Sequence, residues 1–127
     1  MLLDSNLIIY AAQPGFETLR ERLQGTSFAV SPISRIEVLG YHRIKPEHLA
    51  IYERLFSRFR LLPVTVPVVE GAVRLRQRRR MSLGDALVGA TALEHGLKLW
   101  TRNVKDFVWI DGLRVYDPMN DSNISAG

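Results

Sequence analysis

Short β-rich runs alternate along the chain with longer segments of helical periodicity, and this alternation limits the possible folds more than any other feature. The strand-like runs lie at residues 2–3, 27–31, 61–66, 98–101 and 113–116. Helical patterns occupy 16–23, 34–41, 49–59, 67–80 and 82–95. Strands separated by helices are typical of an α/β domain with a central, mostly parallel sheet.

The length and hydrophobic content of the chain predict a single core. With 127 residues, of which 46% are hydrophobic, there is enough apolar material for one well-buried domain. We expect this domain to span residues 1–118 and the polar segment 119–127 to be a flexible tail. Pro63 weakens the strand predicted at 61–66, because proline cannot donate a ladder hydrogen bond.

The charge and cysteine content limit the partners and the compartment. The chain carries 17 Lys and Arg against 13 Asp and Glu, a net charge of +4 that favours an anionic partner such as nucleic acid. Cysteine is absent, which excludes disulfides and thiolate metal sites and is compatible with a reducing compartment. The apolar run LIIYAA is too short to span a membrane, so we expect a soluble cytoplasmic protein.

Four acidic residues stand where an apolar segment gives way to a helix or a turn. They are Asp4 in LLDSN, Glu37 in SRIEVLG, Asp85 in SLGDALVGA and Asp106 in TRNVKDF. Taken one at a time, each is explained well by local structure. The pairs Ser34/Glu37 and Ser82/Asp85 both fit the capping box at a helix N-terminus. Asp4 can start a turn, and Asn103 with Asp106 is a looser relative of the capping pattern.

A chemical interpretation takes the four acids together. In an open parallel sheet, the residues that follow the strands meet at one edge, where ligands bind. Carboxylates gathered there repel one another unless a cation neutralises them. Oxygen ligands without cysteine suit a hard ion such as Mg²⁺ or Mn²⁺, which can activate water and stabilise a phosphodiester under attack. An acidic metal site on a basic protein therefore indicates hydrolysis of nucleic acid.

The same motifs carry a family resemblance. LLDSNLIIY resembles the opening strand and turn of PIN domains, SPISRIEVLGY their second acidic motif, and SLGDALVGATALEHGLKLWTRNVKDF their third and fourth. A small single-domain chain with this order is similar to the VapC toxins of type II toxin-antitoxin modules. The resemblance implies a three-layer α/β/α fold and a metal-dependent endoribonuclease that leaves a 5′-phosphate and a 3′-hydroxyl.

Carried over by position, the resemblance assigns roles to the polar residues. Asp4 and Asp85 are the main metal ligands, and Glu37 and Asp106 complete the site as further ligands or as groups that orient water. Three small polar residues help to order it: Asn6, Thr101 and Asn103. The cofactor implied is Mg²⁺ or Mn²⁺.

The resemblance also implies partners. VapC-type toxins act on RNA, often transfer RNA or ribosomal RNA, form homodimers, and are held inactive by a VapB-like antitoxin whose C-terminal segment wraps the toxin. The segment RLRQRRR offers arginines for RNA phosphates, namely Arg76, Arg78, Arg79 and Arg80. The same arginines can instead form a solvated last helical turn that complements the helix dipole.

Two alternatives stay open. The chain can be a catalytically silent PIN-like module that binds RNA or protein, with the acids serving as caps. It can also be a metal-dependent enzyme acting on DNA or on a phosphorylated small molecule. The presence of all four acids favours the ribonuclease. Small residues near Asp85, among them Gly84 and Gly89, are interpreted as sites of close helix packing.

Overall fold

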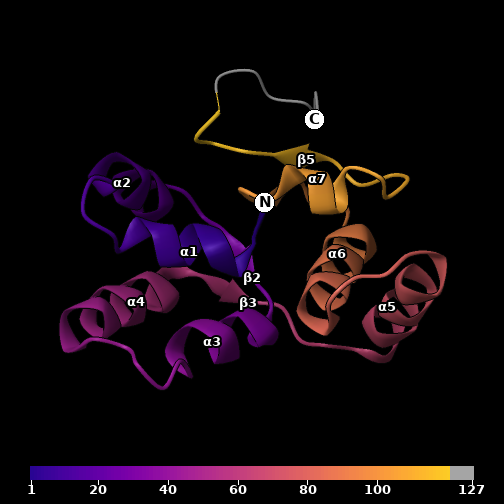
Figure 1. Cartoon of the computed structure of the whole chain (residues 1–127), viewed down its shortest axis with the longest axis horizontal. Coiled ribbons are helices and arrows are strands. Elements are labelled where there is room, and N and C mark those ends of the chain that lie inside the picture. Colours follow the sequence, from indigo (N-terminus) through magenta and orange to yellow (C-terminus); the bar gives the residue numbers. More distant parts are fainter. Residues whose placement is uncertain (121–127) are drawn as a thin grey trace.

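A parallel sheet crosses the centre of the computed structural model, which describes residues 1–120 (Figure 1). Its strands within these residues are short: β1 (Leu2–Leu3), β2 (Ala29–Val30), β3 (Arg60–Leu61), β4 (Leu99–Trp100) and β5 (Val115–Tyr116). They lie in the order β3-β2-β1-β4-β5, and every pair of neighbours is parallel. The predicted α/β architecture is therefore confirmed.

Helices cover both faces of the sheet. On one face lie α1 (Ser5–Ala11), α2 (Glu17–Gly25), α3 (Pro32–Leu39) and α4 (Pro46–Arg58), and on the other α5 (Val66–Arg78), α6 (Leu83–His95) and α7 (Val104–Phe107) (Figure 1). None of the helices within residues 1–120 has the length and apolar character needed to span a bilayer.

The three central strands, β1, β2 and β4, each supply one residue to each of two cores, because successive strand side chains point to opposite faces. Leu2, Ala29 and Leu99 pack against α5, α6 and α7. Their strand neighbours Leu3, Val30 and Trp100 pack against the four helices of the opposite face. The aromatic residues of the helical pattern predicted at 49–59, namely Tyr52, Phe56 and Phe59, are buried in this second core.

The strand predicted at 61–66 is shorter and earlier than expected. It consists of Arg60 and Leu61, both exposed, at the edge of the sheet. Pro63 lies two residues after the end of the strand, and Thr65 then caps α5 by accepting a hydrogen bond from the Val68 amide. An edge position and a proline limit the ladder, so the apolar run continues into a helix instead of a strand.

The capping box predicted for Ser34 and Glu37 is wrong. Helix α3 begins at Pro32, and Ser31 caps it by accepting a hydrogen bond from the Ile33 amide. Proline is favoured in the first helical turn because its missing N–H is not needed there. Glu37 consequently lies in the body of the helix, free to take part in another contact.

The C-terminal part of the described chain stays close to the last strand. Asp117 follows β5, and its carboxylate accepts a hydrogen bond from the Met119 amide at 2.9 Å. The Asn120 amide donates to the Asp117 carbonyl. The rest of the predicted tail, residues 121–127, lies outside the described residues, so the domain boundary stays a prediction.

Candidate active site

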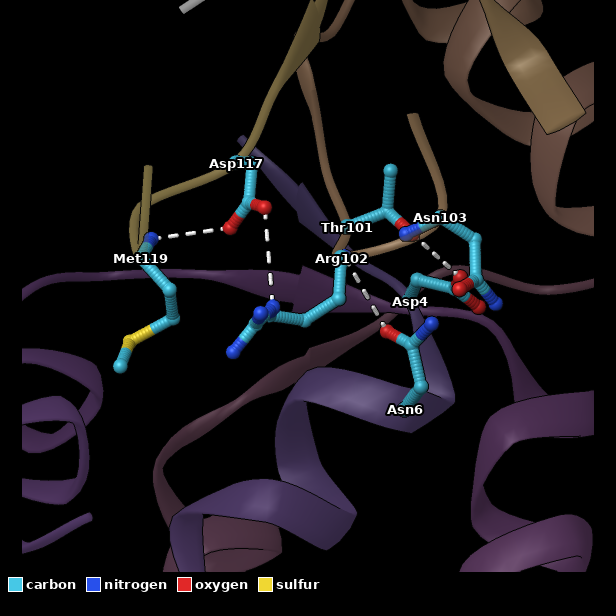
Figure 2. A network of polar contacts seen from close by, with 7 residues as sticks. All are labelled: Asp4, Asn6, Thr101, Arg102, Asn103, Asp117 and Met119. Atoms are coloured by element: carbon cyan, nitrogen blue, oxygen red, sulfur yellow. Dashed lines mark hydrogen bonds and ion pairs between the residues drawn. The ribbon is translucent and has the colours of Figure 1, made fainter. Parts of the chain in front are cut away.

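The site is organised by the point at which the strand order reverses. From β1 the chain builds β2 and β3 on one side, and β4 and β5 lie on the other side. Asp4 follows β1 and Thr101 follows β4, so the two residues flank this switch point, which is where open parallel sheets bind ligands. Thr101 Oγ1 donates a hydrogen bond to Asp4 Oδ2 at 2.8 Å (Figure 2).

Asp4 is a buried carboxyl group with well-defined partners. Its side chain is only 5% exposed, and its Oδ1 accepts a hydrogen bond from the Ser5 amide at the start of α1. Burial raises the pKa of Asp4 to about 6, and the nearby Asp85 and Glu37 charges add to this, against the hydrogen bonds from Thr101 and Ser5. Asp4 is thus the cap of α1, where the local interpretation expected the start of a turn, and also a perturbed acid in the site.

Glu37 is fixed by the hydroxyl group of Ser5, a residue that the sequence did not single out. Ser5 Oγ donates a hydrogen bond to Glu37 Oε1 at 2.7 Å and lies 3.0 Å from Ser34 Oγ. Ser34 is fully buried and Ser5 nearly so. The only sequence signal for Ser5 was its position directly after Asp4.

Helix α6 brings Asp85 near Glu37, because Gly84 lets the start of this helix lie close to the Glu37 carboxylate. A methyl group at Gly84 would lie 2.8 Å from Glu37 Oε2, so the glycine leaves the space that the carboxylate of Glu37 occupies. The packing interpretation holds for Gly89, which faces Ile110 and Leu75. Gly84, in contrast, lies against the carboxylate of Glu37 and not against apolar side chains.

Asp85 lies in the first turn of α6, where Ser82 is the cap. Ser82 Oγ accepts a hydrogen bond from the Asp85 amide at 3.1 Å, as the capping pattern predicts. Burial raises the pKa of Asp85, and the charges of Asp106 and Glu37 raise it further, against a hydrogen bond with Ser82. Electrostatic repulsion therefore links the four acids, Asp4, Glu37, Asp85 and Asp106, into what we call the acidic cluster.

The three small polar residues, Asn6, Thr101 and Asn103, differ in how directly they contact the acidic cluster. Thr101 Oγ1 also accepts a hydrogen bond from the Asn103 amide at 3.0 Å, so this hydroxyl links the loop after β4 to Asp4. The side chain of Asn103 is exposed and makes no capping bond to α7. Asn6 Oδ1 accepts a long hydrogen bond of 3.5 Å from the Arg102 amide (Figure 2).

A further carboxylate, that of Asp117, lies near the loop after β4 and was not predicted as part of the site. Asp117 is 7% exposed, and its Oδ2 forms an ion pair of 3.6 Å with Arg102 Nε (Figure 2). The guanidinium of Arg102 also lies 5.1 Å from the ring centre of Tyr10. Asp117 directly follows a strand, as Asp4 does, and that pattern was its available signal. It is paired with a cation, so it anchors the loop.

The donor set of the acidic cluster fits a hard divalent cation. Its members are carboxylates that repel one another, and among residues 1–120 none forms an ion pair with a lysine or arginine. Oxygen donors of this kind suit Mg²⁺ or Mn²⁺. Over the same residues, no three acidic or histidine side chains are already close enough to form a ligand group.

The arginines of RLRQRRR point in different directions. Arg76 Nε donates to the Met81 carbonyl, and Arg78 lies 3.8 Å from Asp111. Arg79 and Arg80 instead line a hollow that also contains Asp85 and Asp106. The structure therefore brings only the end of the arginine run to the acidic cluster.

Fold and site together define a class: a parallel α/β domain with an acidic site at its topological switch point. The family model described as PIN domain matches residues 1–111. The chain is also 33% identical, over 91% of its length and 93% of the relative's, to the protein named Ribonuclease VapC1 from Rickettsia felis. It therefore belongs to the PIN-domain family and, within it, to the VapC type.

Solved structures agree with this assignment. A chain from a toxin-antitoxin complex of Klebsiella pneumoniae superposes with a TM-score of 0.71 at 32% identity, covering 88% of this chain and 93% of that one. A chain from DNA-bound VapBC of Salmonella typhimurium has a TM-score of 0.77 at 24% identity, covering 91% and 96%. The second likeness shows the shared fold.

Proposed function

We propose that this protein is the toxin of a type II toxin-antitoxin module, an endoribonuclease that hydrolyses RNA phosphodiesters with the help of Mg²⁺ or Mn²⁺. The observation that carries the proposal is the acidic cluster, whose members lie at the switch point of a basic chain without a lysine or arginine partner among residues 1–120. The relative named Ribonuclease VapC1 and the relatives in toxin-antitoxin complexes support it.

The four residues of the acidic cluster have different roles in this proposal. Asp4 and Asp85 would hold the cation, and Glu37 and Asp106 would complete its surroundings or orient the attacking water. When bound, the cation lowers the pKa of a coordinated water and stabilises charge on the phosphate. Thr101 holds the Asp4 carboxylate through its hydrogen bond, and Ser5 holds that of Glu37 in the same way. Asn6 and Asn103 order the adjoining loop through the Arg102 amide and the Thr101 hydroxyl.

The substrate is RNA, with transfer RNA or ribosomal RNA as the leading classes, and the protein works in the cytoplasm. A net charge of +4 favours association with any anionic polymer. The arginines Arg76 and Arg78 lie in the last turn of α5 and add to the positive charge of the surface, whereas Arg79 and Arg80 follow this helix and place positive charge beside Asp85 and Asp106.

A VapB-like antitoxin is the proposed protein partner, in an assembly built on a toxin homodimer. A cavity of about 640 Å³ opens beside Glu37 between α1, α3 and α4. Apolar side chains, among them Ile9, Tyr41 and Ile44, line it together with Arg43 and Lys45. A hollow of mixed apolar and basic lining next to the cluster suits a peptide segment that also blocks the entry of RNA.

Cleavage of RNA by the purified, antitoxin-free chain tests this function. Transfer RNA and total RNA are incubated with Mg²⁺, with Mn²⁺ or with EDTA, in parallel with folded Asp4→Asn and Asp85→Asn variants. We expect discrete fragments with 5′-phosphates that need the metal and disappear in both variants. Equal cleavage by the variants, or none by the wild type, would favour the silent binding module, in which the acids are caps worth about 1 kcal/mol or less.

A further inference from the structure

The hollow beside Asp85 and Asp106 has a basic wall that comes from two distant parts of the chain. It has a volume of about 250 Å³ and lies between the loop after α5 and helix α7. Arg79 and Arg80 approach it from the first side, and Lys105 and Trp109 from the second. Lys105 directly precedes Asp106 in sequence, yet no sequence pattern pointed to it as a site residue.

The cations of this wall are not used to hold the fold. Neither Arg80 nor Lys105 has an ion-pair partner in the described part of the chain, and both are exposed. Arg79 is held in place by an aromatic ring, because its guanidinium carbon lies 5.4 Å from the ring centre of Trp109. Trp109 is itself anchored, since its Nε1 donates to the Asp106 carbonyl at 2.9 Å.

An acidic site needs such a wall if it is to accept RNA. The carboxylates repel every phosphate of the incoming strand except the one that a bound cation neutralises. Lysine and arginine side chains at the rim offset that repulsion for the neighbouring phosphates. The hollow places Arg79, Arg80 and Lys105 beside Asp85 and Asp106, so positive side chains lie where they can offset the repulsion between these acids and RNA.

We propose that the hollow is a subsite for an RNA phosphate that adjoins the scissile one. In it, Arg80 and Lys105 bind the phosphate, and the Arg79–Trp109 pair forms the wall that positions it. This inference rests on the proposed ribonuclease function, and it makes Lys105 and Arg80 substrate-positioning residues. Arg76 and Arg78 have no part in the subsite, because they are directed to Met81 and Asp111.

The test measures RNA binding separately from cleavage. A fluorescein-labelled single-stranded RNA octamer of mixed sequence is titrated in EDTA, by anisotropy, against the wild type, Lys105→Ala and Arg80→Ala at several salt concentrations. Each substitution should weaken binding roughly tenfold, as expected for a lost charge-assisted contact. The slope of log K against log salt should fall in magnitude by about 0.7 for each lost phosphate contact.

Matched variants make the result specific. Arg74→Ala removes an exposed arginine of α5 that lies in another hollow, between α5 and α6, and should leave both quantities unchanged. Lys105→Arg should keep most of the affinity. In Mg²⁺, Lys105→Ala should raise KM while kcat is nearly kept, because a neighbouring phosphate is bound equally in the ground state and the transition state.

The outcomes separate the two proposals. If the wild type cleaves RNA and binds the octamer, but Lys105→Ala and Arg80→Ala keep its affinity and salt slope, the subsite is wrong and the ribonuclease stands. If the wild type binds RNA through these residues without cleaving it under any metal, the hollow is an RNA-phosphate site, but the proposed function fails, and with it the assignment to a phosphate beside the scissile one. A loss of affinity in Arg74→Ala equal to that in Arg80→Ala would also overturn the subsite, since general charge would then explain both.

Discussion

The hydroxyl of Thr101 and the carboxylate of Asp4 are joined by a hydrogen bond of 2.8 Å, although 97 positions separate the two residues in sequence. The bond crosses from the end of β4 to the end of β1, the adjacent strands at which the sheet order reverses. It fixes the orientation of Asp4 and favours its charged form, while burial and the neighbouring acids oppose that form.

The metal-free protein should become less stable as the pH rises from about 5 to 7.5. The pKa of Asp4 is about 6 in the folded state, above the 3.8 of an unperturbed aspartate, so between these values the folded state binds more protons than the unfolded state. Its stability therefore decreases with rising pH, by about 1–2 kcal/mol from this group over that range. Urea denaturation in EDTA at several pH values measures the slope, and a stability that rises through this range would contradict the prediction.

Asp4→Asn should stabilise the metal-free protein at pH 7.5 while removing cleavage. The amide is nearly isosteric, its oxygen can still accept from the Ser5 amide, and its NH₂ group can donate to the Thr101 hydroxyl, so the local bonds persist without a buried charge. We expect a gain of about 1–3 kcal/mol in the free energy of unfolding. Cleavage should fall more than about 100-fold. Circular dichroism controls for the fold, and a variant that is less stable than the wild type would mean that Asp4 acts chiefly as a charged cap.

Thr101→Val should destabilise the protein and raise the pKa of Asp4 further. The substitution removes the donor to Asp4 Oδ2 and the acceptor for the Asn103 amide, leaving buried polar groups unpaired at a cost of about 1–3 kcal/mol. The pH range over which stability falls should move to higher pH, because the Thr101 hydrogen bond favours the charged carboxylate and its loss raises the pKa of Asp4. Thr101→Ser, which keeps the hydroxyl, is the control. Equal pH profiles in the valine and serine variants would show that the hydrogen bond does not tune Asp4.

Divalent metal should stabilise the wild type and have little effect on Asp85→Asn. A ligand that binds only the folded state adds RT ln(1 + [L]/Kd), about 2.7 kcal/mol at 100 times Kd. Repulsion involving Asp4, Asp85 and Asp106 is relieved when a cation binds, so the increase in thermal midpoint with Mg²⁺ should be larger at pH 7.5 than at pH 5. Differential scanning fluorimetry with and without EDTA measures it. An equal shift in Asp85→Asn would place the metal elsewhere.

The fold was predictable because its signals are local and repeated. Short apolar runs and helical patterns alternate along most of the chain, and the alternation of Leu2 with Leu3 between two cores needs no information from elsewhere in the chain. The limits of the elements were less predictable. Pro32 and Ser31 start α3 earlier than the capping pattern at Ser34 indicated, since several residues in a row can cap a helix.

The acids of the site were visible from the sequence, but their supporting contacts were not. Asp4 and Asp85 stand in recognisable motifs, whereas the contact of Ser5 with Glu37 depends on how α1 packs against α3. A serine hydroxyl has no periodicity or spacing that marks it in one sequence. Lys105 was missed for a related reason, because only the tertiary fold places it opposite Arg80.

Gly84→Ala should lower activity without lowering stability. The added methyl group would lie 2.8 Å from Glu37 Oε2, the end of a flexible side chain that can turn away at little cost. Alanine favours the helix over glycine by up to about 1 kcal/mol, so the free energy of unfolding should stay the same or rise. The displaced carboxylate would lose its 2.7 Å hydrogen bond with Ser5 and its place in the acidic cluster. We expect kcat to fall roughly tenfold. Gly25→Ala, where a methyl group meets nothing within 4 Å, is the matched control and should keep full activity. Full activity in Gly84→Ala would show that the position of Glu37 is not needed for catalysis.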